Sequence, residues 1–102
     1  MAKTNITLPH GEIAGFCRRN HIRKLSLFGS VLREDFRPDS DVDVLVEFEE
    51  GRVPGLLRLA GMKNELSKIV GREVDLRTPQ DLSRYFREEV VTSARVEYVE
   101  RQ

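Results

Sequence analysis

The 102-residue sequence has a single cysteine, Cys17, and no tryptophan. A lone cysteine excludes an internal disulfide, and this composition is typical of a reducing compartment. Cys17 lies among residues that are expected to be helical, and no histidine with asparagine or aspartate accompanies it. We therefore expect its thiol to pack in the core rather than to act as a nucleophile.

Net charge and long apolar runs are also missing. Lysine plus arginine number 17, and aspartate plus glutamate number 17. Because proteins that coat nucleic acid depend on a basic surface, nucleic acid is not expected as the main partner. No stretch approaches the roughly 18 apolar residues of a membrane span, and the opening MAKTNITLPHGEIAGF lacks the apolar core of a signal peptide. These features predict a soluble, cytoplasmic protein with no membrane partner.

The length predicts one domain over residues 1–102. Hydrophobic periodicity and turn residues predict the elements in chain order. They are a helix at 9–20, a strand at 22–28, a helical turn up to 35, a strand at 41–48, a helix at 54–70, a strand at 72–77, a helix from 79 to about 93, and a short strand or extended segment at 96–99. This order predicts an α+β domain with α/β character, in which helices pack on a small mixed sheet of about three to four strands.

An unusual concentration of acid opens the clearest strand, in the stretch FGSVLREDFRPDSDVDVLV. Asp41 and Asp43 are two residues apart, so their side chains point to the same side of the strand, about 6 to 7 Å apart. Two bare carboxylates at close range repel each other, and a divalent cation removes that repulsion. Mg²⁺ typically binds one or two carboxylates together with substrate phosphates. Two such ions, about 4 Å apart, can stabilise the attacking and leaving oxygens of a nucleotidyl transfer.

Two further features fit the same chemistry. Asp75 lies mid-strand in VDL and would join Asp41 and Asp43 if the two strands are adjacent. Gly29 lets the backbone approach a phosphate closely, and the N–H and hydroxyl groups of Ser30 can donate to it. The glycine-serine pair and the three aspartates together indicate a nucleotidyl-transfer site far more specifically than any one of them does alone.

Two other interpretations of the acidic cluster remain open on the residues alone. Asp39, Asp41 and Asp43 match the opening of a calcium-binding loop, although the sixth position is Val44 instead of glycine. In a purely structural interpretation, Asp39 caps a turn while the other two carboxylates are solvated at a sheet edge.

The segments FGS, RPDSDVDVLV and VDL together resemble the minimal nucleotidyltransferases of the DNA polymerase β-like superfamily. The resemblance covers about residues 22–94 and implies a polymerase β-like palm fold. It implies nucleotide-binding roles for Gly29, Ser30 and Arg33, and roles in catalysis and metal binding for Asp41, Asp43 and Asp75.

The resemblance further implies ATP as substrate and Mg²⁺ as cofactor, with two ions and Mn²⁺ as an alternative. Minimal nucleotidyltransferases are frequently paired with a helical HEPN-type toxin, so the resemblance implies an antitoxin that transfers AMP to a tyrosine hydroxyl of that partner. In such a short chain, the acceptor surface is expected to come from another protein or from a second copy.

One alternative function is a non-catalytic antitoxin that neutralises its partner by contact. Glu34 favours this alternative, because relatives often have glycine there. The other is a nucleotidyltransferase that acts on a small molecule.

Overall fold

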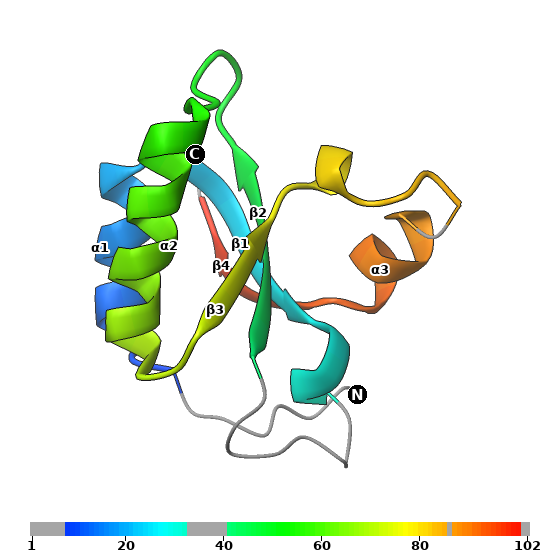
Figure 1. Ribbon diagram of the computed structural model, residues 1–102, viewed down its shortest axis with the longest axis horizontal. Helices are drawn as coiled ribbons and strands as arrows, with labels where there is room; N and C mark the ends of the chain where they lie inside the picture. The colour runs from blue at the N-terminus through cyan, green and yellow to red at the C-terminus, as the bar shows by residue number, and fades with distance from the viewer. Residues whose placement is uncertain (1–7, 33–40, 86, 101–102) are drawn as a thin grey trace.

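A mixed four-stranded sheet forms the centre of the computed structural model, which describes residues 8–32, 41–85 and 87–100 (Figure 1). Strands β1 (Ile22–Phe28) and β2 (Val42–Phe48) pair antiparallel in the middle of the sheet. On the outer side of β2, strand β3 (Val74–Arg77) runs parallel to it, and β4 (Arg95–Val99) pairs antiparallel with β1. The strand order is β3-β2-β1-β4, which confirms the predicted small mixed sheet.

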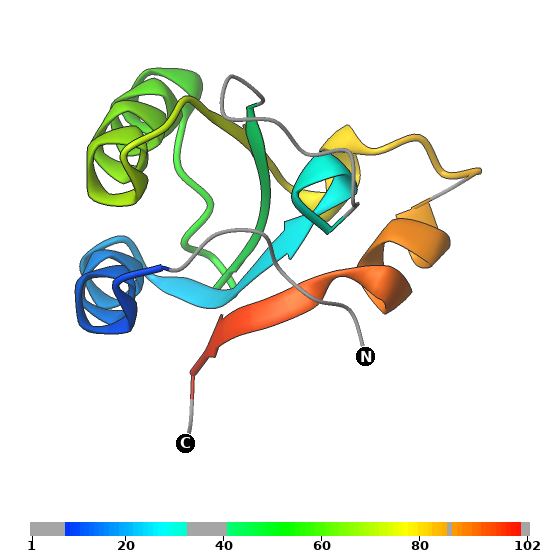
Figure 2. The same ribbon diagram turned by 90° about the horizontal axis from the view of Figure 1, so that it is seen from below.

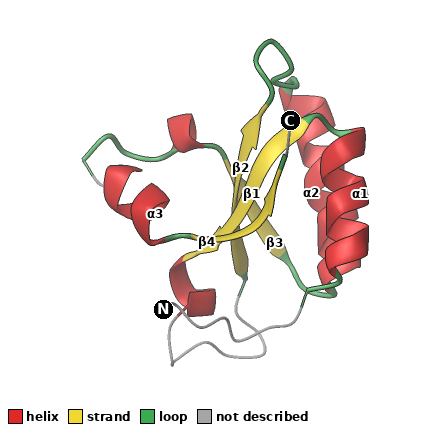
Figure 3. Ribbon diagram, turned by 180° about the vertical axis from the view of Figure 1, so that it is seen from behind, coloured by secondary structure: helices red, strands yellow, loops and turns green. Residues whose placement is uncertain are grey.

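Helices α1 (His10–Arg19) and α2 (Leu56–Val70) lie side by side on one face of the sheet (Figures 1 and 3). The third helix, α3 (Arg87–Ser93), lies on the opposite side, as the view from below also shows (Figure 2). Strand residues that alternate toward α1 and α2 form the core with them, each contributing about 1.5–3 kcal/mol when fully buried. This core contains Leu8, Ile13, Phe16, Cys17, Ile22, Leu25, Leu27, Val42, Val44, Val46, Met62, Leu66, Val74 and Leu76.

The single cysteine lies on the buried side of α1, as its spacing predicts. Ile13, Phe16 and Cys17 are the buried residues of this helix, and Phe16 and Cys17 have no exposed surface. Burial raises the pKa of the Cys17 thiol from 9.0 to about 12. The thiolate is therefore suppressed near neutral pH, and the prediction that Cys17 is a packing residue is confirmed.

The start of α2 differs from the prediction. The helix begins at Leu56 rather than at residue 54, and Leu56 and Leu57 are 87% and 90% exposed. The apolar periodicity of residues 54–70 places Leu56 on the buried side of the helix, and this expectation is wrong, because the stripe that packs on the sheet begins at Leu59. Among the described segments, none of the helices has both the length and the apolar character needed to span a bilayer.

Residues 79–93 form two short elements instead of the single predicted helix. The segment TPQD predicts a helix cap at Thr78, and the structure confirms it, because the N–H and hydroxyl of Thr78 both donate to Oδ2 of Asp81, each at 3.1 Å. This capping box opens only a 3₁₀ turn, η2 (Pro79–Asp81), since Leu82 has an extended backbone with φ −87° and ψ 145°. The chain then runs outward before α3 begins at Arg87.

Candidate active site

The parallel pairing of β2 with β3 places Asp43 directly beside Asp75. Their neighbours Val42 and Val74 are buried in the core, so the two carboxylates project from the opposite face of the sheet. Adjacent strands lie about 4.8 Å apart, which brings the two side chains within reach of one small ligand. The two strands are therefore adjacent, which is the arrangement that the sequence analysis required for Asp75 to lie with Asp43.

Gly29 lies against Asp43 on the side away from Asp75. Strand β1 ends at Phe28, which stands opposite Asp43, and the chain then turns into the 3₁₀ helix η1 (Gly29–Leu32) with φ +72° at Gly29. A Cβ added at Gly29 would lie 2.3 Å from Oδ2 of Asp43 and 3.2 Å from its Cγ. A side chain cannot occupy that space, so glycine is required both for the turn and for the close approach of the carboxylate.

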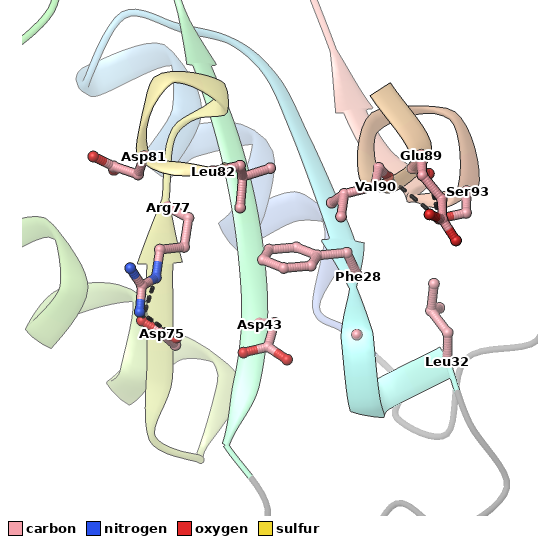
Figure 4. A pocket seen from close by; sticks show the side chains of 11 residues that line it. Phe28, Leu32, Asp43, Asp75, Arg77, Asp81, Leu82, Glu89, Val90 and Ser93 are labelled. Carbon is pink, nitrogen blue, oxygen red and sulfur yellow. Dashed lines mark hydrogen bonds and ion pairs between the residues drawn. The ribbon is translucent and has the colours of Figure 1, made fainter. Parts of the chain in front are cut away.

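These residues line a cavity of about 780 Å³ on the sheet face opposite α1 and α2 (Figure 4). The volume is within the range of about 300–1,000 Å³ typical of small-molecule sites. Apolar side chains form one part of its wall, with Phe28 directed from β1 across β2. Residues of α3 face the sheet from the far side of the cavity. The lining residues are Phe28, Gly29, Leu32, Asp43, Asp75, Arg77, Asp81, Leu82, Glu89, Val90 and Ser93.

Charge in this cavity is unevenly distributed. Its described lining includes four carboxylates, those of Asp43, Asp75, Asp81 and Glu89, against the single guanidinium of Arg77. That guanidinium holds Asp75 side-on, with Nε donating to Oδ1 at 3.1 Å and Nη2 donating to Oδ2 at 3.3 Å. Because an excess of carboxylates makes the cavity negative, it favours a cation.

The predicted site residues do not all converge. Gly29, Asp43 and Asp75 line the cavity, whereas Asp41 lies directly before β2, is exposed and is not among the described lining residues. The backbone of Ser30 belongs to η1, and its side chain is outside what the structure describes. Arg33 and Glu34 lie outside the described residues, as does Asp39. Within the described ranges, no three acidic, histidine or cysteine side chains are grouped closely enough to hold a metal ion together.

Several lining residues were missed by sequence reasoning. Arg77 had a usable signal, because it is two residues after Asp75 and a strand puts both on one face. Phe28 directly precedes the glycine of the FGS motif. Glu89, Val90 and Ser93 had no local signal, since α3 reaches the cavity only through the pairing of the following β4 with β1.

The donor set fits a hard divalent cation together with a nucleotide. Asp43 and Asp75 supply the one or two carboxylates that Mg²⁺ usually takes from a protein, and substrate phosphates complete its coordination. Gly29, which has no side chain, lies directly against the Asp43 carboxylate of this pair. Oxygen ligands do not distinguish Mg²⁺ from Mn²⁺, so the residues fit either ion.

Residues 11–98 match the family model of the nucleotidyltransferase domain. This chain belongs to the nucleotidyltransferase family. A Methanocaldococcus jannaschii relative described as a protein adenylyltransferase is 34% identical over 90 residues, which is 88% of this chain and 95% of the relative. The protein adenylyltransferase MntA of Thermococcus cleftensis is 42% identical over 55 residues, covering 54% of this chain and 54% of that protein. The predicted family and enzyme class are therefore confirmed.

Solved structures confirm the nucleotidyltransferase fold. A minimal nucleotidyltransferase structure that is 38% identical superposes with a TM-score of 0.68, covering 83% of this chain and 85% of the other. A second similar structure is an MNT antitoxin complex with the tri-AMPylated HEPN toxin of Shewanella oneidensis. It has a TM-score of 0.64, 20% identity, and coverage of 89% and 70% of the two chains, so this likeness concerns the fold alone.

Proposed function

We propose that this nucleotidyltransferase transfers AMP from ATP to a protein hydroxyl, a tyrosine of a HEPN-type toxin, and thereby acts as an antitoxin. The observation that carries the proposal is the pairing of Asp43 with Asp75 beside Gly29, in a cavity large enough for a nucleotide. The similarity of most of the chain to a relative described as a protein adenylyltransferase supports a protein acceptor. The AMPylated HEPN toxin found with a structurally similar antitoxin supports the nature of that acceptor. We place this reaction in the cytoplasm, where ATP is available.

The reaction is an in-line displacement at the α-phosphorus. The acceptor oxygen forms a bond to the α-phosphorus, and the bond from that phosphorus to the bridging oxygen of the β-phosphate breaks. Pyrophosphate leaves with the electron pair, and Asp75, beside Asp43 on the neighbouring strand, is proposed to accept the hydroxyl proton.

The chain's own residues bind and orient the reactants. Asp43 and Asp75 would hold the divalent cations, and Asp41, two residues before Asp43 on the same side of the chain, is proposed as a further ligand once its side chain turns toward them. When bound, a pair of such ions would supply electrostatic stabilisation of the entering and leaving oxygens. The absence of a side chain at Gly29 lets the Asp43 carboxylate lie against the turn after β1, and Gly29, Ser30 and Arg33 are proposed to contact the phosphates of ATP.

The test is a transfer assay with α-³²P-labelled ATP, Mg²⁺ and either a purified HEPN-type partner or lysate of the source cells. Asp43→Asn removes the ligand charge at the centre of the site. Glu47→Gln is the matched control, because Glu47 points to the same side of β2 but does not line the cavity in the described part of the chain. We expect labelled partner with wild type and with Glu47→Gln. We expect at least about a thousandfold less label with Asp43→Asn, as the loss of metal stabilisation worth several kcal/mol implies.

Each other outcome contradicts a defined part of the proposal. Label that persists with folded Asp43→Asn would show that the metal site lies elsewhere. Labelled small molecules in place of labelled protein would identify a small-molecule acceptor. Neutralisation of the toxin by Asp43→Asn, with no label on the toxin, would show an antitoxin that acts by contact.

A further inference from the structure

We propose that Arg77 neutralises Asp75 while the enzyme is free of metal, and that it moves to the triphosphate when a divalent cation takes the carboxylate. The inference rests on the proposed function and assigns a phosphate-binding role to Arg77, in addition to the one proposed for Arg33. Arg77 is thus both a substitute for the metal before loading and a substrate-binding residue after it.

The geometry of the pair supports the first half of this exchange. Both oxygens of Asp75 accept hydrogen bonds from one guanidinium, at 3.1 Å and 3.3 Å (Figure 4). A carboxylate offers about four lone-pair sites, and the guanidinium uses one on each oxygen of Asp75. A cation shared with Asp43 therefore competes with the guanidinium for Asp75 and displaces it where the two approach the same oxygen.

The energetics allow that displacement. The side chains of Asp75 and Arg77 are 40% and 48% exposed, and ion pairs with this degree of exposure are weak. A divalent cation between two carboxylates carries twice the charge of the guanidinium and also relieves the repulsion between Asp43 and Asp75. The cation therefore competes well for Asp75.

Charge balance in the cavity supports the second half. Arg77 is the one basic side chain among its described lining residues, where four carboxylates are present. A polyanionic triphosphate is repelled by this lining until a cation is bound. Once released, the guanidinium remains on the same face of β3 and lines the same space, and its planar fork suits phosphate oxygens.

The experiment uses the full-length protein and three variants. Arg77→Gln removes the charge and the fork, while Arg77→Lys keeps the charge and removes the fork. Arg23→Gln is the control, because Arg23 makes a comparable exposed pair with Glu47 at 3.2 Å, on β1 and outside this cavity. Mn²⁺ binding is followed by electron paramagnetic resonance of the free ion without nucleotide. Nucleotide binding is then measured by calorimetry at saturating Mn²⁺, with an ATP analogue that has a methylene bridge between the α- and β-phosphates.

The two affinities are expected to move in opposite directions. Arg77→Gln should bind Mn²⁺ about two- to fivefold more tightly, since a weak competitor is gone. The same variant should bind the analogue about tenfold more weakly, because a charge-assisted contact to phosphate is lost. Arg77→Lys should recover part of the analogue affinity, and Arg23→Gln should change neither affinity by more than about twofold.

Opposite movement of the two affinities excludes a purely structural role for Arg77, which would weaken both, and Arg77→Lys, which keeps the charge, separates the exchange from a general effect of charge. Unchanged Mn²⁺ affinity in Arg77→Gln, or weaker binding, would overturn the exchange while leaving the nucleotidyltransferase site intact. Mn²⁺ binding that is absent from wild type, or that survives in Asp43→Asn, would overturn the metal site and the exchange with it.

Discussion

Oδ2 of Asp43 occupies the space that a side chain at Gly29 would need, 2.3 Å from the position of an added Cβ. The backbone that follows β1 therefore packs directly against the Asp43 side chain of β2. The positive φ of 72° at Gly29 adds a second, independent requirement for glycine. Gly51 has only the second of these requirements. Its φ is nearly the same, +77°, but nothing lies within 4 Å of its added Cβ.

Gly29→Ala is expected to lose both stability and activity. The left-handed backbone alone costs about 1–2 kcal/mol for a residue with a Cβ, and the contact must also displace the Asp43 carboxylate. Urea unfolding and the transfer assay measure the two effects. Gly51→Ala should show a similar loss of stability with full transfer activity. Equal activity in both variants would show that the fit of Gly29 to Asp43 does not matter for catalysis.

Asp75→Asn is expected to leave stability nearly unchanged while activity falls by about a thousandfold. The pair it makes with Arg77 is half exposed, so its loss costs less than about 1 kcal/mol. The matched control is Glu73→Gln, which breaks the exposed pair of Glu73 with Lys63 at 3.3 Å, two residues earlier in the chain. A Glu73→Gln variant as inactive as Asp75→Asn would remove the special role of Asp75.

Thr78→Ala is expected to loosen the turn that carries Asp81 and Leu82 into the cavity. It deletes the hydroxyl that donates to Asp81, and loss of such a cap costs about 1 kcal/mol. Urea unfolding should show that loss, and calorimetry should show weaker binding of the ATP analogue. Thr78→Ser keeps the hydroxyl and should retain most of both. If Thr78→Ser falls as far as Thr78→Ala, the methyl group rather than the cap is responsible.

The buried thiol of Cys17 predicts a stability that declines at alkaline pH. Its pKa is about 12 in the folded chain and 9.0 as an unperturbed thiol, so between these values only the unfolded chain loses the proton. The contribution is fully present below pH 9 and falls by about 1.4 kcal/mol per pH unit above it. Urea unfolding at pH 8, 9.5 and 10.5 measures the slope, and Cys17→Ala should decline less steeply than wild type. Identical slopes would contradict the pKa shift.

The sheet and half of the site are readable from the sequence because their signals are local. Alternation of apolar and polar residues places Asp43 and Asp75 on the face opposite Val42 and Val74. The FGS segment marks the turn after β1, where Gly29 has a positive φ. The same two-residue periodicity places Arg77 on the side of β3 that carries Asp75.

The part of the cavity wall formed by η2 and α3 cannot be predicted from local sequence patterns. The capping box at Thr78 correctly predicts a helix start, but nothing local shows that the turn ends after Asp81 and that α3 starts only at Arg87. The inward side of α3 is decided by the sheet order, in which β4 returns to pair with β1. The exposure of Leu56 is also not evident from the sequence. Leu56 continues the apolar pattern of α2, but the first turn of the helix lies before the stripe that packs on the sheet.

The sheet order β3-β2-β1-β4 has a consequence during synthesis on the ribosome. The two central strands are translated before either edge strand, and domains fold largely as units as the chain emerges. A nascent chain that has released β1 and β2 already displays Gly29 and Asp43, yet it has no Asp75 beside them and no α3 across from them. Strand β4, which is translated after the other three, anchors the wall of the cavity, so a chain that terminates before β4 carries the signature motif without a working site.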